Sequence, residues 1–522
     1  MNSLNNKYIK MQKLFCLLAA FVFLNSQLSF AKSKAKGINE TGFDIEAYIE
    51  SAKTDKVLKI GLVDCIAYAL KGNSDIMIKR IEPKLKKDDV KIARAIFEPT
   101  LDADYTLKDS AKKYPSVAYP EVFENRDIDF NVSLSGKLTT GTEYDIDFIN
   151  ERYLSNLTTQ TINPYYVSQP KVTVTQPLFK DFDIMVNRAD IVIAQNNKAV
   201  SEENFKNTVM DVINKTKTDY YNYIYYLENY SIAKSSLELA QNLLEINKLR
   251  YDKGLVSSVD LLETETAAAQ RQKALISAES GLKEAEDELK LVTNLFEDPE
   301  LWNAGLELID KPELKFEQVD LVESLKNAFK YRPDYISGRI DLKNKDIKIK
   351  AAKNALLPTM DLIGSYTLNG LSDEYRKVLD ELDKDYRDWS VGAKFSIPWG
   401  SGDRAKFDQR KLEKAQALIA FKKLEQDIIM DVKRSVRLAD IQYRQVLASA
   451  LSKEKETLNH RAQKEKYAAG QISTHDMLDY QDKLAQAELD YIKSLIDYNI
   501  ALCSLEKAQG LTLAKNNIKL EE

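Results

Sequence analysis

Three aspartates beside two similar turns are the residues of this sequence whose types and spacing most clearly suggest a chemical role. Asp476 and Asp479 are three residues apart, so they share one face of a helix, and Asp260 occupies the matching place in an earlier segment. Carboxylates grouped in this way attract cations, whereas an Asp at a helix start also serves as an N-terminal cap. With only two histidines, His460 and His475, the chain has little material for acid–base catalysis or a His-rich metal site. We therefore expect no enzymatic activity, no catalytic residues, no cofactor and no metal site.

The aspartates follow two segments that predict turns between helices. Tyr251-Asp-Lys-Gly254 matches Tyr467-Ala-Ala-Gly470, and Asp260-Leu-Leu262 matches Asp476-Met-Leu478. A glycine after the last helical residue allows a tight turn there. The two segments are therefore predicted to be copies of one helix–turn–helix unit.

A longer repeat indicates that most of the chain is duplicated. Residues 62–102 align with residues 321–361 without a gap, and 14 of the 41 aligned pairs are identical, among them Ala69 with Ala328 and Pro99 with Pro358. Self-similarity on this scale is the mark of a repeated structural unit. Each half is predicted to contain a helix, strands, a long helix, a turn and a further helix.

Strict alternation of apolar and polar residues predicts strands in both halves. It runs over residues 101–108, 128–134 and 144–148 in the first half and over residues 391–397 in the second. Strands with one apolar and one polar face suit a β-barrel between lipid and a wet lumen. A half-buried sheet in a soluble domain is the alternative that alternation alone leaves open.

Long helices are predicted to follow the strands. The segments from Asp183 to about Arg250 and from Asp403 to about Lys466 each have more than 60 residues, or about 100 Å of helix. Apolar and small residues recur along them at coiled-coil spacing, for example at Leu237, Ala240 and Leu244. We interpret these stripes as packing seams.

The N-terminus predicts export from the cytoplasm. Lys7, Lys10 and Lys13 precede an apolar run over residues 14–24, and Ser29-Phe-Ala31 offers a cleavage site after Ala31. This pattern is typical of a secretory signal peptide.

Of the two cysteines in the mature chain, Cys65 and Cys503, we expect both to be buried free thiols rather than a disulfide. The formal net charge is −5 and no basic patch stands out, so nucleic acid is not an expected partner.

With both repeats in order, the chain resembles TolC and the wider outer-membrane efflux proteins from about Ile60 to Leu513. The resemblance rests on six short elements. They are Pro99-Thr-Leu101 and Pro358-Thr-Met360, Thr175-Gln-Pro-Leu178 and Ser396-Ile-Pro-Trp399, and the turn segments 250–262 and 466–478.

The resemblance implies a mostly helical, internally duplicated TolC-like fold with membrane strands. It implies a homotrimer whose outer-membrane β-barrel continues into a long periplasmic α-helical barrel. The function implied is a passive exit duct of a tripartite efflux or type I secretion system, working with a periplasmic adaptor (membrane fusion protein) and an inner-membrane RND or ABC transporter. The alternative is a periplasmic coiled-coil scaffold without a pore. Cargo and energy source are left open.

The same resemblance implies roles for residues of the two turns. Family positions of a periplasmic gate map onto Asp260, Tyr467, Asp476 and Asp479. The basic partner expected five residues after Tyr467 is Ile472 here, which departs from the family pattern. An adaptor-docking edge maps onto the exposed part of the two turns, at Gly254, Leu255, Ser257, Gly470 and Ser473, with Gln471 departing from the family's Gly-Leu element.

The expected domain organisation follows the repeats. It comprises a signal peptide (1–31), an N-terminal segment (32–59), a first repeat (60–296), an equatorial linker (297–319), a second repeat (320–513) and a C-terminal tail (514–522). The family usually has two membrane strands in each half. The first half here has additional strand-like sequence around Thr140-Gly141. It can hold four strands, or the extra hairpin can stand outside the membrane; we expect two.

Overall fold

The computed structural model describes residues 57–113, 120, 122–382, 385–397 and 399–520. The predicted signal peptide and nearly all of the predicted N-terminal segment lie outside these residues. The chain divides into two compact units, which are taken separately. Of the described residues, the smaller unit includes Val57, Leu58 and residues 295–307. It contains the short helix η2 (Leu295–Glu297) and parts of β1 (Val57–Ile60) and β6 (Gly305–Leu308).

The larger unit contains the duplicated succession of helices and strands. Its strands are β2 (Thr100–Lys113), β3 (Val122–Lys137), β4 (Glu143–Ser155), β5 (Tyr165–Pro177), β7 (Thr359–Leu368), β8 (Gly370–Ser372) and β9 (Arg387–Ser396). Its helices are α3 (Leu62–Gly72), α4 (Ser74–Arg94), η1 (Ala95–Phe97), α5 (Ile184–Asn187), α6 (Ala189–Asp252), α7 (Ser258–Thr293), α8 (Leu321–Tyr331), α9 (Pro333–Asn354), α10 (Tyr375–Asp380), α11 (Gly402–Ala468), α12 (Thr474–Ala508) and α13 (Thr512–Lys515).

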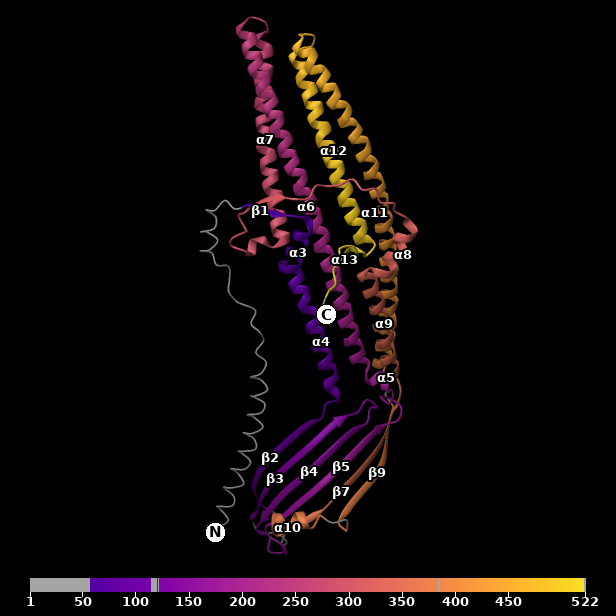
Figure 1. Cartoon of the computed structure of the whole chain (residues 1–522). Helices are drawn as coiled ribbons and strands as arrows, with labels where there is room; N and C mark the ends of the chain where they lie inside the picture. The colour runs from indigo at the N-terminus through magenta and orange to yellow at the C-terminus, as the bar shows by residue number, and fades with distance from the viewer. Residues whose placement is uncertain (1–56, 114–119, 121, 383–384, 398, 521–522) are drawn as a thin grey trace. The chain divides into compact units, whose positions relative to one another are not determined.

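The long strands of the larger unit form one antiparallel sheet in the order β2-β3-β4-β5-β7-β9, with β8 paired to β5 (Figure 1). Four of these strands come from the first half and two from the second. The expectation of two strands in the first half is therefore wrong. The extra hairpin belongs to the sheet because β3 pairs with β4 over 13 residues, from Asn125 opposite Ser155 to Lys137 opposite Glu143. This ladder joins the β2–β3 hairpin to the β4–β5 hairpin, and it gives the facing backbone N–H and C=O groups of β3 and β4 hydrogen-bond partners.

One face of this sheet is mostly apolar on all six strands, with polar residues such as Asn150 and Ser168 toward one end, and the other face is mostly polar. The register places apolar residues opposite one another on the first face, because side chains two apart along a strand share a face. Examples are Leu107 with Ile128, Val132 with Phe148, and Val172 with Tyr366. The opposite face carries Asp102, Ser133, Asp147, Thr173, Ser365 and Ser390 at neighbouring positions.

The long helices form two antiparallel hairpins, α6 with α7 and α11 with α12 (Figure 1). The sequence correctly predicted both, with 64 residues in α6 and 67 in α11. The first long helix begins later than expected, because Asp183 caps the short α5 and α6 starts only at Ala189. The predicted seams are buried, as Leu237 and Ala240 on α6 and Ala501 on α12 show. Small side chains on these seams allow the helices to approach closely.

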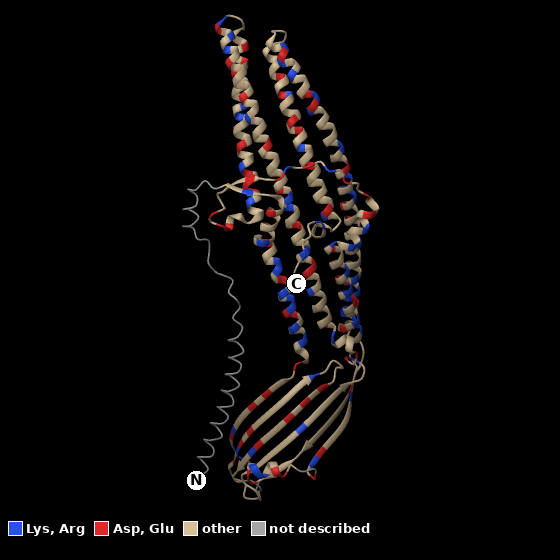
Figure 2. Ribbon diagram, viewed as in Figure 1, with Lys and Arg blue, Asp and Glu red and all other residues tan. Residues whose placement is uncertain are grey.

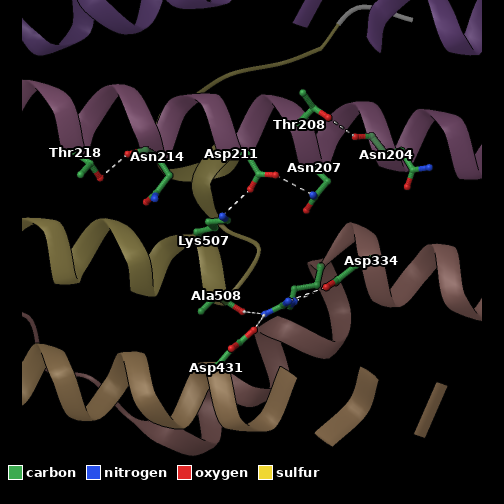
Figure 3. Close-up of polar contacts among 11 residues, drawn as sticks. Asn204, Asn207, Thr208, Asp211, Asn214, Thr218, Asp334, Asp431, Lys507 and Ala508 are labelled. Carbon is green, nitrogen blue, oxygen red and sulfur yellow. Dashed lines mark hydrogen bonds and ion pairs between the residues drawn. The ribbon is translucent and has the colours of Figure 1, made fainter. Parts of the chain in front are cut away.

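Ion pairs and hydrogen bonds connect several helices near the C-terminal end of α12. Figure 3 shows Lys507 of α12 paired with Asp211 of α6, at an N–O distance of 2.7 Å. Nearby, Arg332 bonds the Asp334 carboxylate at 2.7 Å, and it also reaches Asp431 of α11 at 3.6 Å and the carbonyl oxygen of Ala508 at 3.4 Å. The Lys507–Asp211 pair therefore joins the two halves of the chain, and Arg332 links the start of α9 to α11 and α12 within the second half.

Among the described residues, no helix combines the length and apolarity that crossing a membrane would require.

Cys65 and Cys503 are free and buried, as expected from the sequence. Burial raises the pKa of the Cys65 thiol to about 12 and that of the Cys503 thiol to about 11. Neither thiol therefore carries much thiolate at neutral pH.

A pair of lysine substitutions one residue apart tests the two faces of the sheet. The family resemblance implies that the apolar face contacts lipid, where a lysine at mid-depth costs about 2–4 kcal/mol. Val132→Lys on that face is expected to reduce the amount of assembled protein in the outer-membrane fraction severely. Ser133→Lys on the polar face is the matched control and is expected to assemble normally. Equal assembly of both variants would contradict the assignment of the faces.

Candidate functional site

The two predicted turns have the same backbone geometry. Gly254 and Gly470 adopt φ values of 70° and 72°, in the left-handed region that glycine tolerates best. In each turn the next residue closes the helix end. Leu255 N–H donates to the carbonyl of Arg250 and Gln471 N–H to that of Lys466, both at 2.9 Å. This is the hydrogen bond of a Schellman motif, so both long helices end in the same way.

Asp260 and Asp476 cap the helices that leave the turns. Ser257 and Ser473 are the N-caps of α7 and α12, and each hydroxyl accepts a hydrogen bond from the backbone N–H of its aspartate. In return, Asp260 Oδ2 accepts from Ser257 N–H at 3.0 Å, and Asp476 Oδ2 accepts from Ser473 N–H at 3.1 Å. The hydrogen bonds from Ser473 hold the pKa of Asp476 below its usual range. Both aspartates therefore have a structural role as capping-box residues.

Asp479 lies one turn further along α12 and has a different environment. Its carboxylate is half-exposed and forms an ion pair with Lys483, with a distance of 2.6 Å between Asp479 Oδ2 and Lys483 Nζ. Pairs four residues apart on a helix are weak when solvent reaches them. Asp476 and Asp479 thus lie close together at the start of α12, whereas Asp260 is on α7. Within the described part of the chain, no hydrogen bond or ion pair joins Asp260 to the other two.

Tyr467 belongs to a buried polar cluster that fastens the second hairpin to the first. Its hydroxyl donates to Asn247 Oδ1 at 2.8 Å and lies 3.3 Å from Thr474 Oγ1. Asn247 Nδ2 donates to Thr474 Oγ1 at 3.2 Å. Asn247 is fully buried, and the exposed fractions of Thr474 and Tyr467 are 4% and 7%. Because Asn247 lies on α6, these bonds connect the end of α6 to the turn between α11 and α12.

Apolar contacts surround this cluster. Leu243 of α6 packs with Tyr467 and Met477, and Ile472 and Leu478 pack against them. The guanidinium of Arg250 lies 4.9 Å from the centre of the Tyr467 ring. Ile472, which replaces the basic residue expected from the family, therefore contributes packing rather than a polar contact.

Sequence analysis missed Asn247 and Thr474, although Asn247 carries a usable signal. It lies three residues after Leu244 and so continues the spacing of the seam through Leu237 and Ala240. A polar residue at such a core position requires a buried partner and often fixes how helices pair. Thr474 gave no comparable signal, because a threonine beside an N-cap is ordinary.

The first turn has the same backbone but different surroundings. Tyr251 corresponds to Tyr467, yet its exposed fraction is 44%. Leu255, Val259 and Leu262 of this turn are also exposed, at 70%, 63% and 62%. The tip of the first turn carries Asp252 and Lys253, whereas residues 469–473 of the second turn include no Lys, Arg, Asp or Glu (Figure 2). The residues predicted to form an adaptor-docking edge, Gly254, Leu255, Ser257, Gly470 and Ser473, are all exposed.

The comparisons with known proteins agree on one family. Residues 65–295 and 325–511 match the model of the outer membrane efflux protein family, which covers both halves of the chain. This chain belongs to that family. The recognition made from the sequence is confirmed, as is the predicted fold class of a duplicated, mostly helical chain with membrane strands. No curated protein matches the chain in sequence.

Solved structures of outer-membrane channels have the same fold as this outer membrane efflux protein. The Campylobacter jejuni CmeC outer membrane channel is 17% identical with a TM-score of 0.66, over 86% of each chain. The outer-membrane channel OprN is 14% identical with a TM-score of 0.64, over 89% of this chain and 91% of its own. The Neisseria gonorrhoeae MtrE outer membrane channel is 18% identical with a TM-score of 0.61, over 86% of this chain and 89% of its own.

Family membership defines the function at a coarse level. The protein is an outer-membrane exit duct for efflux, as the sequence predicted, and its family is one of channels. The scaffold alternative is disfavoured because both halves supply strands to one sheet with a continuous apolar face. The long helical hairpins are the extended portion that the prediction placed in the periplasm.

The buried cluster around Tyr467 gives a prediction about local stability in this efflux protein. Tyr467→Phe removes a hydroxyl and leaves the buried Asn247 amide oxygen without its donor, at a cost of about 1–3 kcal/mol. Amide hydrogen exchange at the ends of α6 and α11 is therefore expected to accelerate roughly 5- to 150-fold. Hydrogen-exchange mass spectrometry of the purified protein provides the measurement.

Tyr251→Phe is the matched control for this experiment. Tyr251 occupies the same position in the first turn, but its side chain is largely exposed. Its removal is expected to leave exchange unchanged at both turns. Equal acceleration in the two variants, or none in Tyr467→Phe, would show that the cluster does not hold the hairpins together.

Proposed function

We propose that three copies of this outer membrane efflux protein form the passive exit duct of a tripartite efflux or type I secretion system. A periplasmic adaptor and an inner-membrane RND or ABC transporter would deliver the cargo. In this proposal the membrane strands of the three copies enclose the outer pore, and the helical hairpins enclose its periplasmic part. The repeats would occupy residues 60–296 and 320–513, joined by an equatorial linker over residues 297–319.

The buried contact between Tyr467 and Asn247 is the observation that carries the gate in this proposal. It joins the second hairpin to the first at the turn where Asp476 and Asp479 lie. In a trimer, three such turns would bring six like charges together, and like charges repel. A closed tip therefore needs attractive contacts nearby, and the cluster around Tyr467 supplies them. We place Asp476 and Asp479 at the constriction and Asp260 beside it.

Lys483 is expected to tune the charge of this constriction. Its ammonium group pairs with Asp479, so each copy would contribute fewer than two net negative charges to the ring. Asp476 keeps its charge to a lower pH than an ordinary aspartate, because its pKa is lowered by hydrogen bonds from Ser473. The ring would then favour cations over a wide pH range.

Charge substitutions at the start of α12 test the gate. Asp479→Asn is expected to reduce cation selectivity without disturbing the helix cap, and Lys483→Met is expected to increase it. Because the pKa of Asp476 is lowered, the selectivity that remains in Asp479→Asn should persist from pH 7 to pH 5. The measurement is the reversal potential of single channels in a planar bilayer with asymmetric salt.

Asp490→Asn on the same helix is the control for charge alone. Asp490 lies about 16 Å further along α12 than Asp479 at 1.5 Å per residue. Its substitution is expected to leave the reversal potential unchanged. If Asp479→Asn and Lys483→Met both keep the parent's reversal potential, the start of α12 does not line the constriction.

The exposed apolar residues of the first turn suggest where the adaptor binds. Leu255 is 70% exposed at the tip of the α6–α7 hairpin. Exposed apolar groups that cluster in this way mark protein-binding sites. A photo-cross-linking amino acid at Leu255 is expected to capture a periplasmic protein, which mass spectrometry identifies. The same amino acid at Ala278, which is buried on the seam of α7, is the control. Capture at Ala278 and not at Leu255 would contradict docking at the turn.

A further inference from the structure

The sheet of the larger unit ends in two edge strands, β2 and β9. Among the described residues, β2 pairs only with β3, and β9 pairs only with β7. Every residue of β9 is exposed, as are nearly all residues of β2, whereas the strands between them are mostly half-buried. In a membrane, backbone N–H and C=O groups at an open edge find no water to bond, so such edges do not occur in lipid. Both edges therefore require a partner strand.

All six strands are suited to lipid on the same face. The apolar face runs from Leu101 and Leu107 on β2, through Val132 on β3, to Val391 and Ala393 on β9. Leu101, Leu107 and Val391 are exposed by 57% or more. The β2–β3 hairpin thus continues the apolar belt instead of interrupting it. A hairpin outside the membrane would have no reason to carry this face in register with the rest of the sheet.

The duplication provides a template for the missing partner. The pairing of β5 with β7 joins the strand that closes the first repeat to the strand that opens the second. In sequence, Thr175 at the end of β5 corresponds to Ser396 at the end of β9, and Thr359 at the start of β7 corresponds to Thr100 at the start of β2. Pairing of β9 with β2 of a second copy repeats the same junction between two chains.

The template also fixes the register. Val172 lies opposite Tyr366 in the β5–β7 pair, and these positions correspond to Ala393 and Leu107. Thr175 lies opposite Ile363, and these positions correspond to Ser396 and Asp104. This register places Ala393 and Leu107 together on the apolar face and Ser396 and Asp104 together on the polar face. A register shifted by one residue would place one partner of each pair on the wrong face.

The side chains and strand directions are compatible with this junction. Lys394 on the polar face of β9 would lie diagonally across from Asp104, a favourable pair of opposite charges. Successive strands of the sheet are antiparallel, and each copy supplies an even number of long strands. A β9 strand therefore meets the next copy's β2 in the antiparallel sense, and the ring closes without a parallel pair.

We infer that β9 of one copy pairs with β2 of the next, with Ala393 opposite Leu107 and Ser396 opposite Asp104, so that the barrel has six strands from each copy. This inference rests on the proposed trimer, whose barrel wall would then consist of eighteen strands, six from each copy. Two strands in each half would give twelve. Barrel diameter grows about linearly with strand number, so this barrel is roughly 1.5 times as wide, in the range that leaves an aqueous channel in porins.

Pairs of cysteines test this junction in the full-length protein. Leu107→Cys with Ala393→Cys is expected to give interchain disulfides under mild oxidation, seen as dimers and trimers on a non-reducing gel. Asp104→Cys with Ser396→Cys on the other face is an independent second pair. Cys65 and Cys503 of the parent protein are expected to give little background, because burial raises the pKa of both thiols. Leu101→Cys with Ala393→Cys is the matched control; its residues are about 20 Å out of register and should not cross-link.

Two measurements separate failure of this inference from failure of the proposed trimer. An amine-reactive cross-linker applied to the parent protein reports the trimer without reference to the strands, and it also shows whether each cysteine variant has assembled. A parent protein without trimers would overturn the proposed assembly. If the variants assemble as trimers and neither cysteine pair cross-links, the strand junction is wrong. Cross-linking of Ala393→Cys to Ile146→Cys on β4, in place of Leu107→Cys, would show that the barrel closes without the β2–β3 hairpin.

Discussion

The requirement that every backbone N–H and C=O group in lipid be hydrogen-bonded within protein governs this fold. It explains why six long strands from two distant parts of the sequence form one sheet, and why the apolar face continues across all of them. The strand register joins Leu107, Ile128 and the residues beyond them into one belt. The same requirement makes one copy incomplete, because β2 and β9 end the sheet among the described residues. In the proposed trimer, assembly would therefore complete the sheet of this outer membrane efflux protein.

The helical hairpins are stabilised by a combination of apolar packing on their seams and polar contacts between them. Their seams bury small residues such as Ala240 and Ala501, which bring helices close but remove only modest apolar area from water. Polar contacts between the hairpins therefore help to determine which positions of the two hairpins lie side by side. The buried Asn247 can be satisfied only when Tyr467 and Thr474 reach it, so it specifies one arrangement of the hairpins. An interaction of this kind would suit the proposed gate, because a few hydrogen bonds can break without unfolding the helices.

The two turns show how one local structure can serve two purposes. Gly254 and Gly470 have the same backbone conformation, and the same Ser–Asp capping box starts each following helix. Yet Tyr467 is buried against α6, whereas the equivalent Tyr251 is exposed. The capping role that the sequence offered as the simpler interpretation of Asp260 and Asp476 is present in the structure. It does not conflict with the proposed charge ring, because a capping carboxylate keeps its charge.

Local patterns in the sequence were sufficient for the family, the duplication, the long helices, the turns and the faces of the strands. Heptad spacing, alternation, glycine and capping residues act over a few positions, so they can be interpreted without knowing the fold. Tertiary structure alone decided that the additional hairpin joins the sheet, that Asn247 binds Tyr467, and that Tyr467 is buried while the equivalent Tyr251 is exposed. The strand order and the Asn247 contact join residues far apart in the sequence, and the burial of Tyr467 depends on the neighbouring hairpin. These outcomes depend on which surfaces meet in space, and the pattern along one chain does not contain that information.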